Sequence, residues 1–226
     1  IIGIKKAEKG RELPPNYRIR SIVKDKEGGV IIVGEYYSFH VKTTTSNGKT
    51  TTTYTWVYDD VIVSSFDKDG NENWTNVIPK EQRFSKSSSS ISFGIGGPSL
   101  LVTASIPYSL KTQKNVYLGI VCAVHDENIY VIFNDHPKNV GMTEADDFKR
   151  LNNPHKGLTT AFVVNFSGKM KRIDTEDAAA NEVVIRPGIS NQVESNELLI
   201  YASKRKKDKV GRIVFGESKR NIVTSK

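Results

Sequence analysis

The chain has 226 residues, enough for one large all-β domain or two small ones, and enough to bury a core without disulfides. Apolar residues make up 37% of the chain and recur along its whole length, which excludes disorder throughout. The net charge is +8, but its densest run, 204–209, lies between two apolar segments, so we interpret it as a solvated turn and not as a nucleic-acid surface.

The first eighty residues alternate between apolar and polar with a period of two, which is typical of strands. Residues 19–25 predict a short strand and 30–43 a long one rich in β-branched and aromatic residues. Asn47-Gly48 predicts a hairpin turn from which 50–66 returns. We expect this Thr- and Tyr-rich hairpin, 36–60, to project beyond the core. Another strand follows the next turn and ends at Pro79.

The middle of the chain changes character. Residues 83–115 are interpreted as an insertion, in which the Ser/Gly tract 84–99 is loop-like and 100–107 forms one more strand. A short helix is predicted at 143–152, with Thr143 as its N-cap. The remaining segments alternate again and predict strands at 116–126, 129–135, 158–166, 170–175, 182–190, 197–204 and 211–217.

These segments form a repeat of a strand, a turn, an apolar strand, a variable loop, another apolar strand, an X-Gly turn and a short polar strand. The units span approximately 19–82, 116–175 and 181–217, within a single all-β domain of residues 1–226. Such units predict an all-β fold of antiparallel four-stranded propeller-type blades with a projecting hairpin. Closed propellers have about four to eight blades, so either strands are missing, another subunit completes the ring, or the units pack as a sandwich.

The run DDVIVSSFDKDGNENW resembles repeats of secreted bacterial propellers, which carry a strand, a D-x-D-G-N turn and a Trp opening the outer strand. With WTNVIPKEQ, IYVIFNDHPKN and VGRIVF, the chain is similar to an uncharacterised family of bacterial cell-envelope proteins over about residues 19–217. The resemblance implies an exported protein of the periplasm, the outer membrane or the cell surface. Its motifs are structural, so it assigns no catalytic residues.

Asp67 and Asp69 begin a calcium-loop pattern, but Gly70 stands fourth where an EF-hand needs it sixth, and Ile78 stands twelfth where a Glu is required. The alternative is a β-turn in which Asp67 accepts backbone hydrogen bonds and Gly70 supplies a positive φ. We favour the turn and expect no resident metal and no cofactor.

A binding site, if there is one, is expected where Asn134-Asp135-His136 ends a strand, because loops at strand ends of a propeller carry ligands. Lys80 and Gln82 are assigned to the same candidate site. No zincin motif or nucleophile elbow occurs in the sequence. The adjacent Asp59 and Asp60 are expected to point to opposite faces of a strand, which excludes a shared proton relay.

The second candidate surface is a row of aromatic residues, Tyr54, Trp56 and Tyr58, which share one strand face by the two-residue period. An exposed row of this kind can stack on a sugar ring or contact a partner protein, and packing across the hairpin explains it equally well. Trp74 is expected to pack in the core or between units and not to form a sugar-stacking platform. Cys122, the single cysteine, is expected to be a buried apolar residue.

The sequence therefore predicts a non-catalytic binding or scaffolding protein of the bacterial cell envelope, a subunit or accessory of a larger surface or outer-membrane assembly. The alternative is a glycan-acting hydrolase or a carbohydrate-binding module on a propeller scaffold, and a hydrolase predicts a pocket with two carboxylates about 5–10 Å apart. The expected partner is a protein of an envelope complex or a glycan, and no nucleic acid. No stretch reaches about 20 apolar residues, so no transmembrane helix is expected, while peripheral membrane association stays open.

Overall fold

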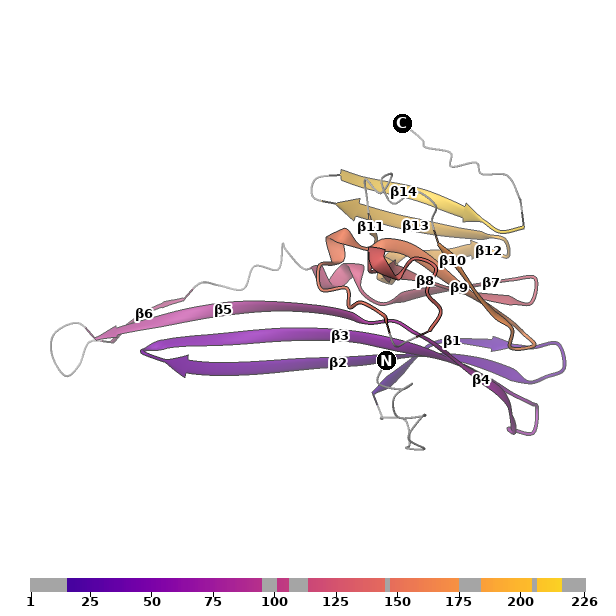
Figure 1. Cartoon of the computed structure of the whole chain (residues 1–226), viewed down its shortest axis with the longest axis horizontal. Helices are drawn as coiled ribbons and strands as arrows, with labels where there is room; N and C mark the ends of the chain where they lie inside the picture. The colour runs from indigo at the N-terminus through magenta and orange to yellow at the C-terminus, as the bar shows by residue number, and fades with distance from the viewer. Residues whose placement is uncertain are drawn as a thin grey trace.

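The computed structural model describes residues 16–94, 101–105, 114–144, 147–174, 184–204 and 207–216, and these are mostly antiparallel β-strands (Figure 1). The prediction of an all-β, antiparallel protein is confirmed. Four short 3₁₀ helices lie between described strands: η2 (Lys114–Tyr117), η3 (Pro137–Asn139), η4 (Pro154–Lys156) and η5 (Pro187–Ile189). Within the described part of the chain, no helix is long and apolar enough to cross a membrane.

The first sheet combines six strands in the order β1-β2-β3-β5-β6, with β4 also paired to β3. β3 can pair with both β4 and β5 because β4 pairs with its residues 61–66 and β5 pairs with its residues 49–58. The strands are β1 (Tyr17–Lys24), β2 (Val30–Ser46), β3 (Lys49–Phe66), β4 (Glu72–Ile78), β5 (Gln82–Gly94) and β6 (Leu101–Ser105).

The prediction of a loop at 84–99 is wrong for residues 84–94, which belong to β5. The tract has serine on both faces, so it lacks the alternation by which a strand is recognised. It becomes a strand because the far half of β3 offers it a free edge, and serine hydroxyls of β5 meet threonine hydroxyls of β3. Residues 95–99, the rest of the tract, lie outside the described part.

The second sheet is a four-stranded meander in the order β10-β9-β8-β7. The third sheet is built around β13, which pairs with β14 along one edge and with both β11 and β12 along the other. The strands are β7 (Ile120–His125), β8 (Asn128–Asp135), β9 (Leu158–Asn165), β10 (Met170–Asp174), β11 (Val184–Ile185), β12 (Asn191–Glu194), β13 (Glu197–Lys204) and β14 (Lys207–Val214).

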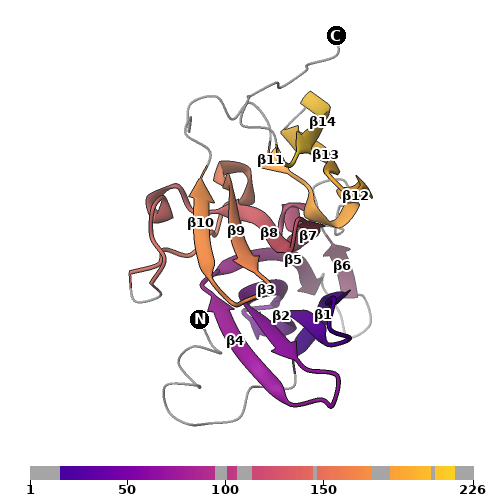
Figure 2. The same cartoon turned by 90° about the vertical axis from the view of Figure 1, so that its right-hand side faces the viewer.

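The three sheets are stacked in chain order, with the second sheet between the other two (Figure 2). Alternate side chains of β8 face the two interfaces of the second sheet, one with the first sheet and one with the third. Val131 and Phe133 pack into a core shared with the first sheet, whereas Ile132 packs into a core shared with the third. This double burial explains why the sequence of β8 is a nearly continuous apolar run. Cys122 of β7 packs against the first of these cores.

One five-residue turn recurs three times, at Asp25–Gly29, Asp67–Asn71 and Asn165–Lys169. In each turn the first residue's N–H donates to the fifth residue's carbonyl oxygen, at 2.9–3.1 Å, and its own side-chain oxygen accepts the fifth residue's N–H. The fourth residue is always a glycine with φ between +85° and +92°. The side chain thus takes the place of a backbone acceptor, which is why Asp or Asn begins each turn.

Trp74 joins the first sheet to the second at the third of these turns. Its indole N–H donates to the carbonyl oxygen of Phe166 at 3.1 Å, and the amide of Asn76 donates to the carbonyl oxygen of Gly168 at 2.7 Å. The ring lies so close to Gly168 that a Cβ there would be 3.0 Å from ring carbons. Trp74 therefore packs between units, as expected from the sequence.

We expect Gly168→Ala to destabilise the fold by about 2–4 kcal/mol. The alanine would have to adopt the left-handed backbone conformation, and its Cβ would clash with the Trp74 ring. Gly70→Ala is the matched control, since Gly70 has a φ of +87° in the same turn position, but a Cβ added there would meet no atom within 4 Å. The free energy of unfolding of Gly70→Ala should fall by only about 1–2 kcal/mol. Chemical denaturation measures both, and equal losses would contradict the role given to Trp74.

The helix predicted at 143–152 is not found in its described residues, 143–144 and 147–152. The described residues 142–144 and 147–152, which we call the strap, are non-helical, and Leu151 forms an isolated bridge with Gln82. The N–H of Leu151 donates to the carbonyl oxygen of Glu81 at 2.8 Å, and the N–H of Lys149 donates to the Asn139 side chain at 2.8 Å. These tertiary hydrogen bonds replace the ones that a helix would have made internally.

Beyond the stack, β2, β3 and β5 continue together as a long projection (Figure 1). We call residues 37–57 and 83–94 the arm. Asn47 and Gly48 form its turn, both with positive φ, as Asn-Gly predicts. The projecting hairpin expected from the sequence is present, and β5 makes it three strands wide over much of its length.

Candidate functional site

The first polar cluster centres on Glu35 of β2, whose side chain is fully buried. Its Oε1 lies 2.8 Å from the Lys80 Nζ, and its Oε2 lies 2.5 Å and 2.7 Å from two guanidinium nitrogens of Arg20. The Lys80 side chain is also fully buried, between the rings of Tyr58 and Phe133. One carboxylate is thus paired with two cations at the root of the arm.

Gln82 and Asn134 continue this cluster as a chain of buried amides. The Gln82 side chain donates to the carbonyl oxygen of Asn134 at 2.6 Å and accepts the Gly119 N–H at 2.8 Å. The Asn134 side chain donates to the carbonyl oxygens of Tyr117 and Ile185 at 2.7 and 2.8 Å. The two amides therefore tie together backbone from all three sheets.

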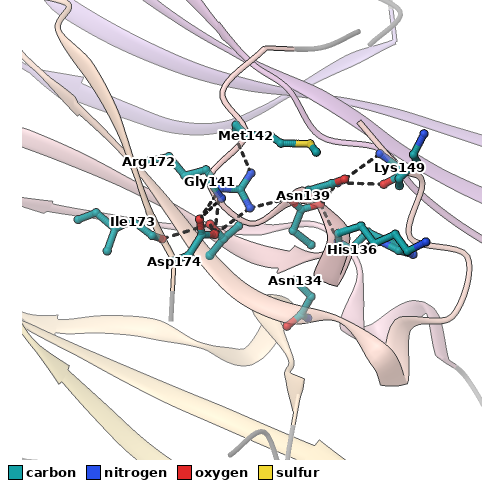
Figure 3. Close-up of polar contacts among 12 residues, drawn as sticks. Asn134, His136, Asn139, Gly141, Met142, Lys149, Arg172, Ile173 and Asp174 are labelled. Atoms are coloured by element: carbon teal, nitrogen blue, oxygen red, sulfur yellow. Dashed lines mark hydrogen bonds and ion pairs between the residues drawn. The ribbon is translucent and has the colours of Figure 1, made fainter. Parts of the chain in front are cut away.

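The second polar cluster surrounds Arg172 of β10, whose side chain is 3% exposed (Figure 3). Its guanidinium contacts Asp135 at 2.9 Å and both carboxylate oxygens of Asp174 at 2.8–2.9 Å, and it donates to the carbonyl oxygen of Met142 at 3.1 Å. Asn139 donates to Asp135 at 2.8 Å and holds the strap at Lys149. This cluster fastens the loop after β8 to the edge of the second sheet.

Burial and pairing set the ionisation of the two carboxyls in opposite directions. Burial raises the pKa of Asp135 above its usual range, although Arg172 and Asn139 oppose the shift. Burial also acts to raise the pKa of Asp174, but the hydrogen bonds from Arg172, Gly141 and Thr160 outweigh it and hold that pKa below its usual range. Both carboxyls have hydrogen-bonded partners that suit the charged form.

The structure brings together three of the residues assigned to the first candidate site, Lys80, Gln82 and Asn134, and places Asp135 in the second cluster. All four are closed to solvent and are at most 1% exposed. His136 is partly buried, and its Nδ1 accepts the Lys138 N–H at 3.1 Å as the cap of η3. The arrangement holds the sheets together and offers a ligand no access, so we assign these residues a structural role.

Asp67 and Asp69 form the second of the recurring turns. Asp67 accepts hydrogen bonds from the N–H groups of Asp69 and Asn71 and from the Asn71 side chain, at 2.8–2.9 Å. The Asn71 side-chain bond is the largest cause that lowers the pKa of Asp67. Among the residues that the structure describes, no group of three His, Cys, Asp or Glu side chains is placed to hold a metal ion.

Asp59 and Asp60 lie in a bulge of β3, so the regular alternation assumed for them is wrong. Val61 pairs with Glu35 and Tyr58 with Tyr37, which leaves both aspartates opposite one residue of β2. Both are buried, at 4% and 0% exposure. Burial and these two carboxyls raise the pKa of the Tyr17 phenol, and burial raises the pKa of Asp59. The bulge ends the core part of β3 and begins the arm.

One face of the arm carries an aromatic cluster. Trp56 lies at its centre, with ring centroids 5.2 Å from Phe39, 6.5 Å from Tyr54 and 5.8 Å from Phe84. Phe39 is 44% exposed and its neighbour Val41 is 54% exposed. Of the predicted row, Tyr54 and Trp56 thus lie on an accessible surface. Their neighbours Phe39 and Phe84 join them across the sheet, which the sequence of one strand could not show.

Tyr58, the third member of the row, lies at the root of the arm. Its ring lies 4.9 Å from that of Tyr37 and covers Gly119, which directly precedes β7. Burial raises the pKa of Tyr58 to about 12, with a further contribution from the Glu35 carboxylate. Tyr58 therefore belongs to the buried cluster and not to the accessible aromatic face.

The opposite face of the arm is a ladder of hydroxyl groups. Thr51, Thr53 and Thr55 of β3 form hydrogen bonds of 2.7–3.1 Å with the serines opposite them on β5. A long polar strand is held straight in this way without a core beneath it. The arm also contains no Asp or Glu, whereas Lys42, Lys49, Arg83 and Lys86 give it four positive charges.

Two concavities formed by described residues bear on function. The first, about 450 Å³, lies where the arm leaves the stack and is lined by Asn16, Tyr17, Arg18, Tyr37, Ser38, Phe39 and His40. The second, about 240 Å³, is lined by Met142, Thr143, Glu144 and Asp147 on the strap. The first was missed by sequence reasoning because its residues come from two strands, β1 and β2, that meet only in the fold.

Comparisons with known proteins assign no family. No family model matches the chain, and a search of curated proteins found no significant match. Among solved structures, a mannose phosphorylase from Leishmania mexicana in complex with phosphate matches at 9% identity over 94% of this chain and 91% of that one. Its TM-score is 0.19, which is too low to carry any argument about fold or function.

Proposed function

We propose that the protein is a non-catalytic binding or scaffolding protein of the bacterial cell envelope, a subunit or accessory of a larger surface or outer-membrane assembly. The arm is the observation that supports this function. It leaves the stacked sheets, covers no core, and presents exposed aromatic and aliphatic side chains on one face. Exposed apolar surface of this kind marks interaction sites in soluble proteins.

We further infer that the three sheets are propeller-type blades. Their chain order, their meandering strands and the recurring turn support this inference. The outer strands at both ends of the stack carry exposed aliphatic side chains, at Ile19 and Ile22 of β1, and at Val193, Val210 and Val214 of the third sheet. In a propeller such faces pack on the next blade, so further sheets would cover them here.

A photo-crosslinking phenylalanine in place of Trp56 should form adducts with a partner when the tagged protein is made in its own bacterium. The same group in place of Lys68, on an exposed turn of the stack, is the control and should form none. Fractionation of the same cells tests the location, with the adducts expected in the envelope fraction.

Two results would contradict the proposal. One is a protein found in the cytoplasm without arm-dependent adducts. The other is turnover of a glycan that is lost in Glu144→Gln or Asp147→Asn, because those two carboxylates line the second concavity. That result would establish the hydrolase alternative instead.

A further inference from the structure

We propose that the outer edge of β2 in the arm binds an extended acidic segment of a partner protein, which adds to the sheet as a strand antiparallel to β2. This inference rests on the proposed binding function and names the chemistry of the partner. The bound segment would alternate apolar and acidic residues and would place a carboxylate in the first concavity.

The backbone of β2 provides the first part of the argument. β1 pairs with β2 only as far as Tyr36, and one more bond follows, from the Tyr37 N–H to the carbonyl oxygen of Asn16 at 3.0 Å. Among the residues described, no strand pairs with this edge of β2 beyond Tyr37.

The free edge is regular. From Tyr37 to Ser46, β2 pairs with β3 without a register shift, so every second residue points its backbone N–H and C=O to the same side. Because Tyr37 points outward to Asn16, the residues that follow at intervals of two also point outward. They are Phe39, Val41, Thr43 and Thr45. An added strand can bond to all four, which is the usual mode of strand addition.

Side chains on the two faces of the edge define the chemistry of the partner. Phe39 and Val41 lie on the aromatic face and are both largely exposed, so an added strand would place apolar residues beside them. His40 and Lys42 lie on the opposite face and are exposed. Residues beside them would be acidic, since the arm has four cations and no Asp or Glu.

The first concavity lies at the head of the free edge and favours an anionic end. Arg18 lies 3.5 Å over the ring of Tyr37, and His40 lies across the opening, with its Nε2 2.9 Å from the Ser38 hydroxyl. A strand antiparallel to β2 would arrive here with its C-terminal end. Its terminal carboxylate, or an acidic side chain, would meet the guanidinium of Arg18.

Charge also argues against a second copy of the chain as the occupant. Two arms paired along β2 would bring Lys42 of each copy toward the other arm, which carries four cations and no anion. Like charges placed opposite each other destabilise a strand pair. A neutral glycan would use the aromatic face but has no charge to complement the four cations of the arm.

The test uses the whole protein and a fluorescein-labelled peptide, (Val-Glu)₄ with a free C-terminus. The matched control is (Val-Lys)₄. Anisotropy should show at least tenfold tighter binding of the acidic peptide, weakening as salt is raised. Two further peptides are methylated at the backbone nitrogens, one at the glutamates alone and one at the valines alone. Their affinities should differ by about tenfold, because only one of these two sets of N–H groups faces β2.

Three variants locate the peptide. Val41→Pro removes an outward N–H that the β2–β3 ladder does not use, and should weaken binding about tenfold while circular dichroism stays unchanged. Lys42→Glu should weaken binding about tenfold. Lys86→Glu is the control, because it changes the same charge on β5, at the other side of the arm.

Equal binding of the acidic and basic peptides, or no binding of either, would overturn the inference. So would equal effects of Lys42→Glu and Lys86→Glu. A concentration-dependent dimer of the free protein that Val41→Pro abolishes would give the edge to a second copy instead. Failure here is distinguishable from failure of the proposed function, since adducts from position 56 in the envelope fraction would still show a partner at the arm.

Discussion

Glu35→Gln is expected to destabilise the fold by about 3–5 kcal/mol at neutral pH, more than Lys80→Met does. Glu35 is the carboxylate paired with the Lys80 ammonium, and the two side chains are fully buried. Removing the carboxylate leaves a buried cation whose remaining partners are neutral groups, among them Gln82 at 3.4 Å and two ring faces, together with the electrostatic influence of Asp59. Arg20 loses its partner too, but it is 30% exposed and can turn to water.

Lys80→Met should cost less, about 1–3 kcal/mol, because Glu35 keeps its two contacts with Arg20. The double variant Glu35→Gln/Lys80→Met should lose less than the sum of the two, with a coupling of about 0.5–3 kcal/mol. Lys68→Met on an exposed turn is the control and should stay within about 0.5 kcal/mol of the wild type. Urea denaturation measures all four, and a larger loss for Lys80→Met than for Glu35→Gln would refute the assigned charge balance.

Strands were the predictable part of this fold, because a period of two follows from burial of one face. The pattern predicted β2, β3 and β8 and the Asn47-Gly48 turn within a few residues. It missed β5, whose serines carry no hydrophobic pattern and which forms only because β3 offers an edge. It predicted a helix in the strap, where tertiary bonds to Asn139 and Glu81 decide the conformation.

The candidate site residues likewise divide into those that the sequence could predict and those that it could not. Lys80, Gln82 and Asn134 do converge, but polarity in a sequence does not reveal whether a group faces a ligand or a buried partner. Glu35 and Arg172, which complete the two clusters, stand in strands with no motif around them. Phe39 and Phe84 join Trp56 only through the pairing of three strands. Pairing across a sheet is non-local information, and one strand read alone does not contain it.

Arg172→Met is expected to cost about 3–5 kcal/mol at neutral pH, because it leaves the Asp135 and Asp174 carboxylates without the cation between them. The methionine retains contact with the rings of Phe148 and Phe162, so the loss reports on charge more than on packing. Lys171→Met, on the same strand but exposed, is the matched control and should change the free energy of unfolding by less than about 0.5 kcal/mol.

The loss should depend on pH in one direction only. Arg172 lowers the pKa of both carboxyls in the folded protein, so its removal raises both, and for Asp135 it adds to the rise caused by burial. A folded state with raised carboxyl pKa values binds more protons than the unfolded state, and its stability falls as pH rises. In the wild type the lowered pKa of Asp174 does the opposite, adding stability above the ordinary carboxyl pKa of about 4.

The deficit of Arg172→Met relative to the wild type should therefore be smallest near pH 4 and should grow as pH rises through the raised pKa values, reaching its full size by pH 7. Unfolding in urea at a series of pH values between 4 and 8 measures it. The additional change Asp135→Asn should remove part of the growth, because an amide stays neutral in that buried position. A deficit that is equal at pH 4 and pH 7 would mean that Arg172 acts by packing alone, and the charge argument for this cluster would be wrong.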